Sequence, residues 1–242
     1  MTPPALLLLP GLLCDAEVWS AQASAFSIDR PVLVAEYGLD DDLATMARTA
    51  LAQADAAGLG PLAVAGHSMG GRVAMELWRL APQRVRGLAL MDTAWHPLPG
   101  GEAGATERAG RERLMALGRE QGMVAMARDW VRGMVHPARL DTPLMDAVVA
   151  MLARRSPAHQ AAQVKALLNR PDASAVLRTV TVPTLLLTGA QDGWSPPGRH
   201  DEMATMVAGP ATRVDVPDCG HMAPMEAPEA VNAALRDWLA AL

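Results

Sequence analysis

The chain contains few of the residue types that mark several common classes of protein. Its 242 residues include only two cysteines, one tyrosine and one phenylalanine. The cysteines, Cys14 and Cys219, lie far apart in sequence and form neither a disulfide framework nor a CxxC redox or zinc pattern. We therefore expect two reduced thiols in a cytoplasmic protein and no metal site.

Long apolar runs and basic clusters are also missing. No window of the sequence approaches the roughly 20 apolar residues that a membrane-spanning helix needs. Arginine supplies nearly all the positive charge, because Lys165 is the only lysine, and no basic run is interleaved with aromatic side chains. Together with a net charge of −5, this composition argues against a nucleic-acid or membrane partner.

The N-terminal segment LLLLPGLLC, residues 6 to 14, allows two interpretations. An apolar run followed by a cysteine can be an export signal, but residues 1 to 4 contain no Lys or Arg, and Pro10 interrupts the run. The alternative is a buried strand that leads into a loop. We favour the strand, and an N-terminus processed after residue 13 would contradict it.

Five short apolar runs predict the strands of a parallel sheet. They span residues 5–9, 32–35, 62–65, 88–91 and 184–187. The runs alternate with helical patterns and lack polar alternation, which is typical of strands covered by helices on both faces. A sixth strand, residues 213–216, does alternate and so fits the edge of the sheet. The length favours a single α/β domain over residues 1–242.

Residues 96–178 break this alternation with several helical patterns and no convincing strand. Thr142 and Pro143 have the form of a helix cap followed by proline at the first helical position, and residues 98–106 have that of a glycine-rich, mobile connection. An insertion at this place lies over the C-terminal edge of the sheet, where open α/β folds bind ligands. We therefore predict a helical lid over residues 96–178.

The motif GHSMGG, residues 66–71, stands between a predicted strand and an apolar helical pattern. A strand, a sharp turn and a helix form the setting of a nucleophile elbow, which exposes the serine hydroxyl from a strained conformation. Glycine is needed at positions 66 and 70, because a Cβ atom would collide across so tight a turn. Ser68 is therefore a candidate nucleophile.

Two later segments offer partners for this serine. A serine hydroxyl is a weak nucleophile unless an imidazole accepts its proton and a carboxylate orients that imidazole. Asp192 and His221 each stand just past the end of a predicted strand, and the order Ser, Asp, His is met. Asp92, after the fourth apolar run, competes for the role of the acid. His67 either supports the loop or contacts the substrate.

Together these features resemble the α/β-hydrolase superfamily over the whole chain. The matching motifs are LPGLL at 9–13, GHSMGG at 66–71, TGAQDGWSP at 188–196 and CGHMAPMEAPEAV at 219–231. The resemblance implies Ser68 as nucleophile, His221 as general base and then general acid, and Asp192 as the carboxylate that orients His221. It also implies an oxyanion hole formed by the backbone N–H groups of Leu12 and Met69.

The resemblance further implies an α/β-hydrolase fold, here with a change at the N-terminus. Relatives usually begin with a β-hairpin, whereas the first strand here starts within the first handful of residues. We expect a mostly parallel sheet of about six strands, with the hairpin shortened or absent.

Apolar side chains of the predicted lid and loops are candidate walls of a substrate pocket. They are Leu13, Trp95, Met126, Trp130, Met134, Met145, Trp194 and Met222. For any single methionine, packing between lid and body is the commoner role. The expected activity is hydrolysis of carboxylic esters or lactones of small to medium apolar substrates, through an acyl-enzyme and without a cofactor.

The predicted lid also carries an excess of positive charge, which supports a second hypothesis. Its arginines include Arg108, Arg111, Arg113, Arg128, Arg132, Arg154 and Arg155. They could bind an acidic carrier protein that holds the acyl group, although interspersed acidic residues also fit a salt-bridged, solvated face. A carbon–carbon bond hydrolase, against which Met222 argues weakly, and a non-catalytic binding protein are further alternatives.

Overall fold

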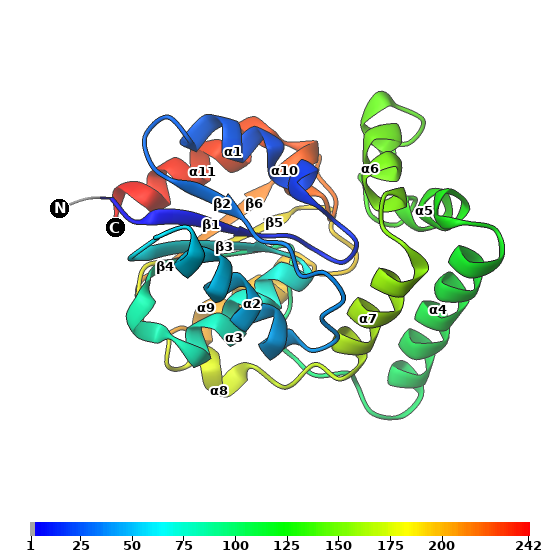
Figure 1. Ribbon diagram of the computed structural model, residues 1–242, viewed down its shortest axis with the longest axis horizontal. Coiled ribbons are helices and arrows are strands. Elements are labelled where there is room, and N and C mark those ends of the chain that lie inside the picture. Colours follow the sequence, from blue (N-terminus) through cyan, green and yellow to red (C-terminus); the bar gives the residue numbers. More distant parts are fainter. Residues whose placement is uncertain (1–2) are drawn as a thin grey trace.

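The computed structural model describes residues 3–242 as one sheet with helices on both faces and a further helical layer beside it (Figure 1). The six strands are β1 (Ala5–Leu9), β2 (Val32–Val34), β3 (Leu62–His67), β4 (Val85–Met91), β5 (Thr184–Gly189) and β6 (Ala211–Val216). Their order is β2-β1-β3-β4-β5-β6, and every neighbouring pair is parallel. The predicted α/β fold is confirmed, with β6 at an edge.

Several strands run further than their apolar runs. Parallel pairing continues until His67 lies opposite Met91 and Gly189 lies opposite Val216, although neither His67 nor Gly189 is an apolar strand residue. The carboxyl ends of these strands therefore meet at one edge of the sheet. The loops that carry the predicted site residues start there.

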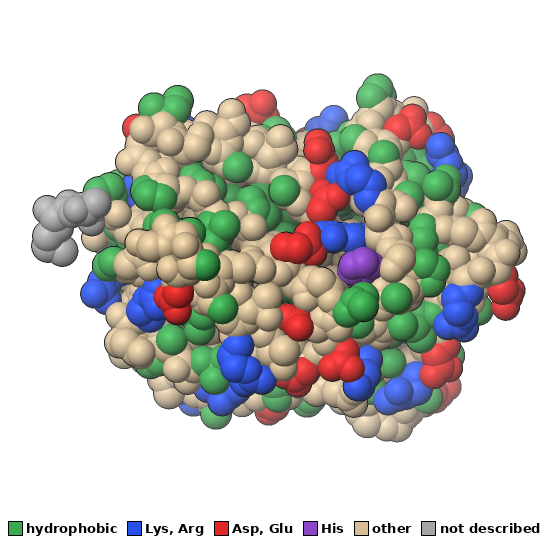
Figure 2. All heavy atoms as spheres, viewed as in Figure 1, with side chains coloured by type: hydrophobic (Ala, Val, Ile, Leu, Met, Phe, Trp, Pro, Cys, Tyr) green, Lys and Arg blue, Asp and Glu red, His purple; other side chains and the backbone are tan. Residues whose placement is uncertain are grey.

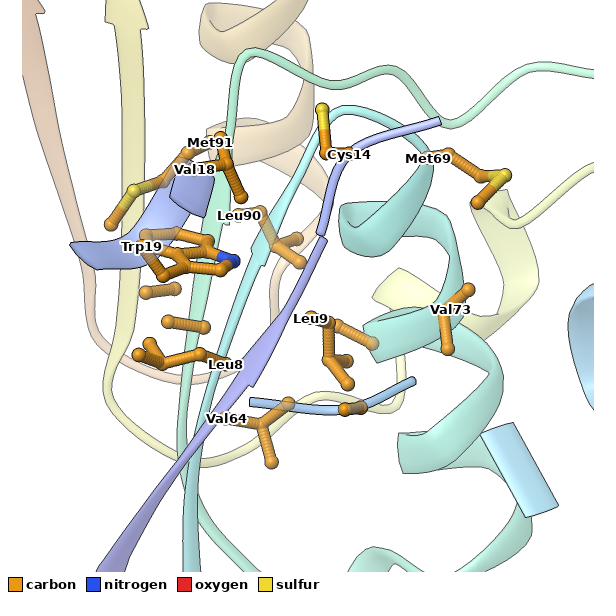
Figure 3. Close-up of a cluster of buried hydrophobic side chains, with 14 of the residues drawn as sticks. Leu8, Leu9, Cys14, Val18, Trp19, Val64, Met69, Val73, Leu90 and Met91 are labelled. Atoms are coloured by element: carbon orange, nitrogen blue, oxygen red, sulfur yellow. The ribbon is translucent and has the colours of Figure 1, made fainter. Parts of the chain in front are cut away.

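The interpretation of the segment around Leu6 as a buried strand is confirmed. All five residues of β1 are buried. Leu8 and Leu9 point to opposite faces of the strand (Figure 3). Leu8 points toward Trp19, and Leu9 points toward Val73 of the helix that follows β3. Each leucine so buried contributes roughly 1.5–3 kcal/mol to stability. Of residues 1 to 4, which precede this strand, residues 1 and 2 lie outside the described residues.

Helices cover both faces of the sheet. α1 (Ser20–Phe26) and α11 (Pro228–Ala240) lie on one face, and α2 (Leu43–Ala56), α3 (Met69–Leu80) and α9 (Pro197–Met206) lie on the other (Figure 1). The Asp42 carboxylate caps α2 by accepting the N–H of Thr45 at 2.9 Å. Among residues 3–242, no helix combines the length and apolar character needed to cross a membrane.

The region predicted as a lid is helical. It contains α4 (Gly101–Glu120), α5 (Met123–Val131), α6 (Pro143–Ala153), α7 (Pro157–Leu168) and α8 (Ser174–Leu177). The helices α4 to α7 stand together beside the sheet, and we call them the helical layer (Figure 1). α8 instead lies against α3.

One local prediction in this region is wrong, and another is confirmed. Residues 98–106 are not a connection throughout, because α4 begins at Gly101. There Gly104 packs so closely on the chain that a Cβ atom would stand 1.8 Å from the carbonyl oxygen of Pro99. Thr142 does occupy the cap position before α6, although its hydroxyl donates to the carbonyl of Arg139 at 2.6 Å and accepts no N–H of the helix. Pro143 does occupy the first helical position.

Candidate active site

Ser68 occupies a sharp turn between β3 and α3. Its backbone has φ 56° and ψ −116°, a conformation that costs a non-glycine residue of order 1–3 kcal/mol. A Cβ atom at Gly66 would lie 2.2 Å from the carbonyl oxygen of Gly70, and one at Gly70 would lie 2.0 Å from that of Leu9. The turn therefore requires glycine at both positions.

The structure brings Ser68, His221 and Asp192 into one chain of hydrogen bonds. Nε2 of His221 lies 2.8 Å from Oγ of Ser68, and Nδ1 of His221 lies 2.8 Å from Oδ2 of Asp192. His221 and Asp192 are both buried. A hydroxyl, an imidazole and a carboxylate connected in this order can activate the serine by general-base catalysis.

The Asp192 carboxylate is held by its own loop. Its second oxygen, Oδ1, accepts the backbone N–H groups of Trp194 at 2.8 Å and Ser195 at 2.9 Å. Burial raises the pKa of Asp192, but the charge and hydrogen bond of His221 and these two N–H groups outweigh burial and bring the pKa below its usual value. Asp192 is therefore ionised at neutral pH.

Asp92, the competing acid, does not contact His221. Its carboxylate accepts the N–H groups of Gly189 at 2.9 Å and Ala223 at 3.3 Å, and lies 3.8 Å from Nε2 of His67. Burial, reinforced by the charge of Asp192, raises the pKa of Asp92 well above its usual value. Asp92 thus connects β5 to the loop after β6 rather than orienting the imidazole.

His67 touches both the loop and the cavity described below. Its Nε2 lies 2.7 Å from the carbonyl oxygen of His221, and His67 also lines the cavity. Burial and the neighbouring His221 lower the pKa of His67 to about 3, so the ring is neutral and Nε2 donates to that carbonyl. The sequence left two roles open for His67, support of the loop and contact with the substrate. The hydrogen bond to the carbonyl of His221 is the structural evidence for support of the loop.

Glu226 is a buried residue of the site that sequence reasoning missed. Its Oε1 accepts the N–H groups on either side of His221, those of Gly220 at 3.1 Å and Met222 at 3.0 Å. Its Oε2 accepts the N–H of His136 at 2.7 Å. The loop that carries His221 is therefore fastened to the segment before α6. The only sequence signal was an acidic residue five positions after His221.

The backbone donors predicted for an oxyanion hole lie at the same place. Leu12 and Met69 both line the cavity that Ser68 opens into, and in residues 3–242 neither N–H donates to a protein acceptor. Met69 is the first residue of α3, where N–H groups have no partner within the helix. The next amide in the first loop, that of Leu13, donates to Oε1 of Gln163 at 2.7 Å.

A cavity of about 470 Å³ opens at Ser68 and His221. Four of the predicted pocket residues line it: Trp130, Met134, Trp194 and Met222. The rings of Trp130 and Trp194 stack with their centroids 5.7 Å apart, and the ring of Trp194 lies 4.9 Å from that of His221. The volume suits a small organic ligand.

The other four predicted pocket residues do not line the cavity. Leu13 and Met126 are completely buried at 0% exposure, within the packed interior. The sulfur of Met145 accepts the N–H of Asp141 at 3.3 Å, and Trp95 packs on the ring of His96. These side chains stabilise the contact between helices and body, which is the commoner role of apolar residues.

Charged side chains, none of which was predicted as a pocket wall, also line the cavity. They are Arg72, Arg111, Arg113, Arg170, Arg199, Glu107 and Asp92. For Arg72, its place in the helical pattern directly after the GHSMGG motif was the available signal.

The arginines of the helical layer are mostly paired with carboxylates. The pairs are Arg111–Glu107, Arg113–Asp129, Arg128–Asp146, Arg154–Asp15 and Arg155–Glu36. On the face that Figure 2 shows, positive and negative side chains are correspondingly interspersed. This is the salt-bridged face that the sequence allowed, and it weakens the case for an acidic carrier protein.

The two cysteines take no part in the hydrogen-bond chain at Ser68. Burial raises the pKa of both thiols, that of Cys14 to about 12 and that of Cys219 further, so neither is a thiolate at neutral pH. Both are free and buried. In the part of the chain that the structure describes, no three His, Cys, Asp or Glu side chains are grouped to hold a metal ion.

Known proteins resemble the chain in family, sequence and fold. A family model described as "Alpha/beta hydrolase family" matches residues 6–234. A thermophilic esterase from Thermogutta terrifontis, solved with malate bound, is 27% identical with a TM-score of 0.86, covering 99% of this chain and 90% of that one. An enol-lactonase from Burkholderia xenovorans LB400 is 21% identical with a TM-score of 0.84, covering 99% and 92%.

A curated relative is longer than this chain. It is the dihydrolipoyllysine-residue acetyltransferase component of an acetoin cleaving system from Pseudomonas putida, 28% identical over 251 residues. The match covers 97% of this chain but spans only 63% of the relative's length.

Proposed function

Because the chain belongs to the alpha/beta hydrolase family and is a hydrolase, we propose that it cleaves carboxylic esters or lactones by a serine mechanism. The observation that carries the proposal is the hydrogen-bond chain from Ser68 through His221 to Asp192 at the mouth of a cavity. The esterase from Thermogutta terrifontis, 27% identical, supports an ester as the substrate class. A lactone is a cyclic ester and requires the same chemistry.

In the first half of the proposed reaction, Oγ of Ser68 attacks the substrate carbonyl while Nε2 of His221 takes the hydroxyl proton. Asp192 stabilises the imidazolium that forms. The N–H groups of Leu12 and Met69 receive the negative charge on the carbonyl oxygen, and each such donor is worth about 3 kcal/mol. His221 then gives its proton to the leaving alkoxide, and the acyl group stays on Ser68.

In the second half, water replaces the alcohol. His221 takes a proton from the water as it attacks the acyl-enzyme carbonyl, and the same two N–H groups again stabilise the oxyanion. Collapse of this intermediate returns the proton from His221 to Oγ of Ser68 and releases the acid. No group other than these side chains and N–H groups is needed.

The surroundings of Ser68 support a small to medium acyl group. Trp130, Met134, Trp194 and Met222 give the cavity an apolar wall, and its volume of about 470 Å³ suits a ligand of this size. We propose that residues 96–178 act as a lid, since Trp130 and Met134 of this insertion reach the cavity. A cytoplasmic location, with a small-molecule rather than a carrier-protein substrate, completes the proposal.

The test is hydrolysis of 4-nitrophenyl esters of increasing acyl length by the purified protein and by Ser68→Ala. Without its nucleophile the variant is expected to lose at least about 10⁴-fold in kcat. A fluorophosphonate probe should label the wild type and not the variant. Ser24→Ala, which removes an exposed hydroxyl of α1, serves as the matched control. Equal turnover by wild type and Ser68→Ala would refute the serine mechanism.

A further inference from the structure

The cavity at Ser68 contains more positive charge than the hydrolysis of an apolar ester requires. Five arginines line it: Arg72, Arg111, Arg113, Arg170 and Arg199. The acidic side chains of the lining are Glu107 and Asp92, and both oxygens of Asp92 accept backbone N–H groups of the body. Five arginines therefore share the cavity wall with two carboxyl groups.

Three of the five arginines are paired with carboxylates. Arg113 pairs with Asp129, at 2.5 Å between Nη2 and Oδ2. Arg111 and Arg170 share Glu107, whose oxygens lie 2.8 Å from Nη2 of Arg111 and 2.7 Å from Nη2 of Arg170. One carboxylate therefore serves two guanidinium groups, which leaves this part of the cavity positive.

The remaining two, Arg72 and Arg199, have no carboxylate within 4.0 Å among residues 3–242. Each is fixed by one hydrogen bond to a carbonyl, from Nη1 of Arg72 to His96 at 3.0 Å and from Nη1 of Arg199 to Trp194 at 2.7 Å. Each guanidinium has five N–H donors, so donors remain for a ligand. Both side chains are half-buried, and a partly desolvated cation without a directly paired carboxylate is stabilised by a bound anion.

The electrostatic surroundings of Arg72 and Arg199 also favour a negative ligand. Burial lowers the pKa of Arg72 to about 9, and the charge of Arg170 contributes to the shift, yet the group remains a cation at neutral pH. Burial also lowers the pKa of His96, whose ring feels the positive charges of Arg199, Arg72 and Arg170. The guanidinium groups thus create a positive field at one place, and the field favours a negative ligand.

The positions of Arg72 and Arg199 connect this field to the reaction. Arg72 stands in the first turn of α3, the helix that directly follows Ser68, and both residues line the same cavity. Arg199 belongs to α9, the helix after the Asp192 loop. Both charges therefore stand on rigid elements and in the cavity that holds the nucleophile.

We propose that Arg72 and Arg199 bind a carboxylate of the substrate, so that the ester or lactone cleaved here carries a second, anionic group. The planar guanidinium matches a carboxylate through two parallel N–H···O bonds. Trp130 and Trp194 then enclose the apolar part of the molecule between the carboxylate and the scissile carbonyl. The identity of the substrate rests on the proposed function, whereas the anion site does not.

Binding tests the anion site without catalysis. Calorimetry on Ser68→Ala is expected to show binding of glutarate and of monomethyl glutarate, and no binding of dimethyl glutarate. Adding Arg72→Met or Arg199→Met should weaken the binding about tenfold or more, and Arg72→Lys, which keeps the charge, should weaken it less. Arg86→Met, at an exposed arginine at the other end of β4, is the matched control and should not change it.

Kinetics connect the site to the reaction. The wild type is expected to hydrolyse the mono-4-nitrophenyl ester of glutaric acid at least about tenfold faster, in kcat/KM, than 4-nitrophenyl pentanoate. Arg72→Met should lower that ratio about tenfold, whereas Arg86→Met should leave it unchanged. Circular dichroism establishes that each variant is folded.

The outcomes separate the two proposals. Binding of glutarate that depends on Arg72, without turnover of either ester, would overturn the proposed function and leave the anion site standing. Turnover that prefers the neutral ester, together with no binding of glutarate, would overturn the anion site alone. Tighter binding of inorganic phosphate than of glutarate would overturn the assignment to a carboxylate.

Discussion

Two buried carboxyl groups, those of Asp92 and Asp192, stand at the ends of adjacent strands, and their pKa values move in opposite directions. Asp192 gains the partner charge of His221 and two N–H donors, which outweigh its burial. Asp92 has N–H donors as well, but its burial and the nearby charge of Asp192 dominate. A pair of acids whose pKa values are separated in this way fits two different roles, one that serves the imidazole and one that connects the loops.

At this residue scale, Asp192→Asn is expected to lower kcat for 4-nitrophenyl esters about 10⁴-fold, because an amide stabilises neither the imidazolium nor the required tautomer. Since the pKa of Asp192 lies below its usual value, the carboxylate stays ionised from pH 5 to 9, and the loss should be constant over that range. Asp92→Asn, at the acid that makes no hydrogen bond to the ring of His221, is the control. If Asp92→Asn lowered kcat as much as Asp192→Asn, the assignment of Asp192 as the acid that orients His221 would be contradicted.

The three residues of the hydrogen-bond chain could be selected from the sequence because chain order and strand ends restrict the choice. Ser68, Asp192 and His221 each follow a strand, and parallel strands bring their loops to one edge. Pocket residues are not restricted in this way. Met126 and Trp130 stand four residues apart on α5, yet Met126 is completely buried and Trp130 lines the cavity. Which side chain reaches the cavity depends on how α5 packs, and the sequence does not contain that information locally.

At the scale of elements, the sheet could be predicted and the ends of several helices could not. Buried strands are recognised by unbroken apolar runs, but β3 continues to His67 only because its hydrogen bonds to β4 continue. α4 starts within a glycine-rich segment of low helix propensity. At that start Gly104 packs on the carbonyl oxygen of Pro99, which a residue with a Cβ atom could not do.

Glu107 of α4 provides a pH-dependent contact between elements. Its carboxylate pairs with Arg111 of the same helix and with Arg170 beyond α7. Partial burial opposes ionisation, but the hydrogen bonds of Arg170 and Arg111 lower the pKa of Glu107 to about 2. The folded pKa lies below the unfolded value of about 4.3. The contact therefore stabilises the fold above about pH 4.3, and its contribution falls as the pH drops toward 2.

Glu107→Gln should accordingly lower the free energy of unfolding most at pH 7, and the difference from wild type should shrink below about pH 4.3. Urea unfolding at pH 7, 5, 4 and 3 measures this difference. Glu112→Gln, at an exposed position of the same helix, is the control and should show a small difference that changes little with pH. A Glu107→Gln difference that stays constant down to pH 3 would contradict the assigned ion pairs.

At the scale of the whole molecule, the helical layer is connected to the sheet through the loops of the site itself. The N–H of His221 donates to the carbonyl of Met134 at 2.6 Å, and Glu226 accepts the N–H of His136. On the other side of the cavity, Gln163 of α7 accepts the N–H of Leu13 in the loop after β1. Packing of the layer and geometry of the site should therefore change together.

Gln163→Leu tests that coupling. The change introduces an apolar side chain of similar size and leaves the buried N–H of Leu13 without an acceptor. This loss should lower the free energy of unfolding by about 1–3 kcal/mol. Because Leu13 follows the proposed oxyanion donor Leu12, kcat for 4-nitrophenyl esters should fall as well. Urea unfolding and kinetics measure the two effects.

Gln160→Leu provides the comparison for this prediction. Gln160 is buried on the same helix, and its Oε1 accepts no hydrogen bond within the described residues, so its replacement should cost less stability. If Gln163→Leu lowers stability but leaves kcat unchanged, the loop after β1 keeps its shape without α7. The helical layer would then cover a site that the sheet and its loops form by themselves, and if kcat falls too, the layer forms part of the site.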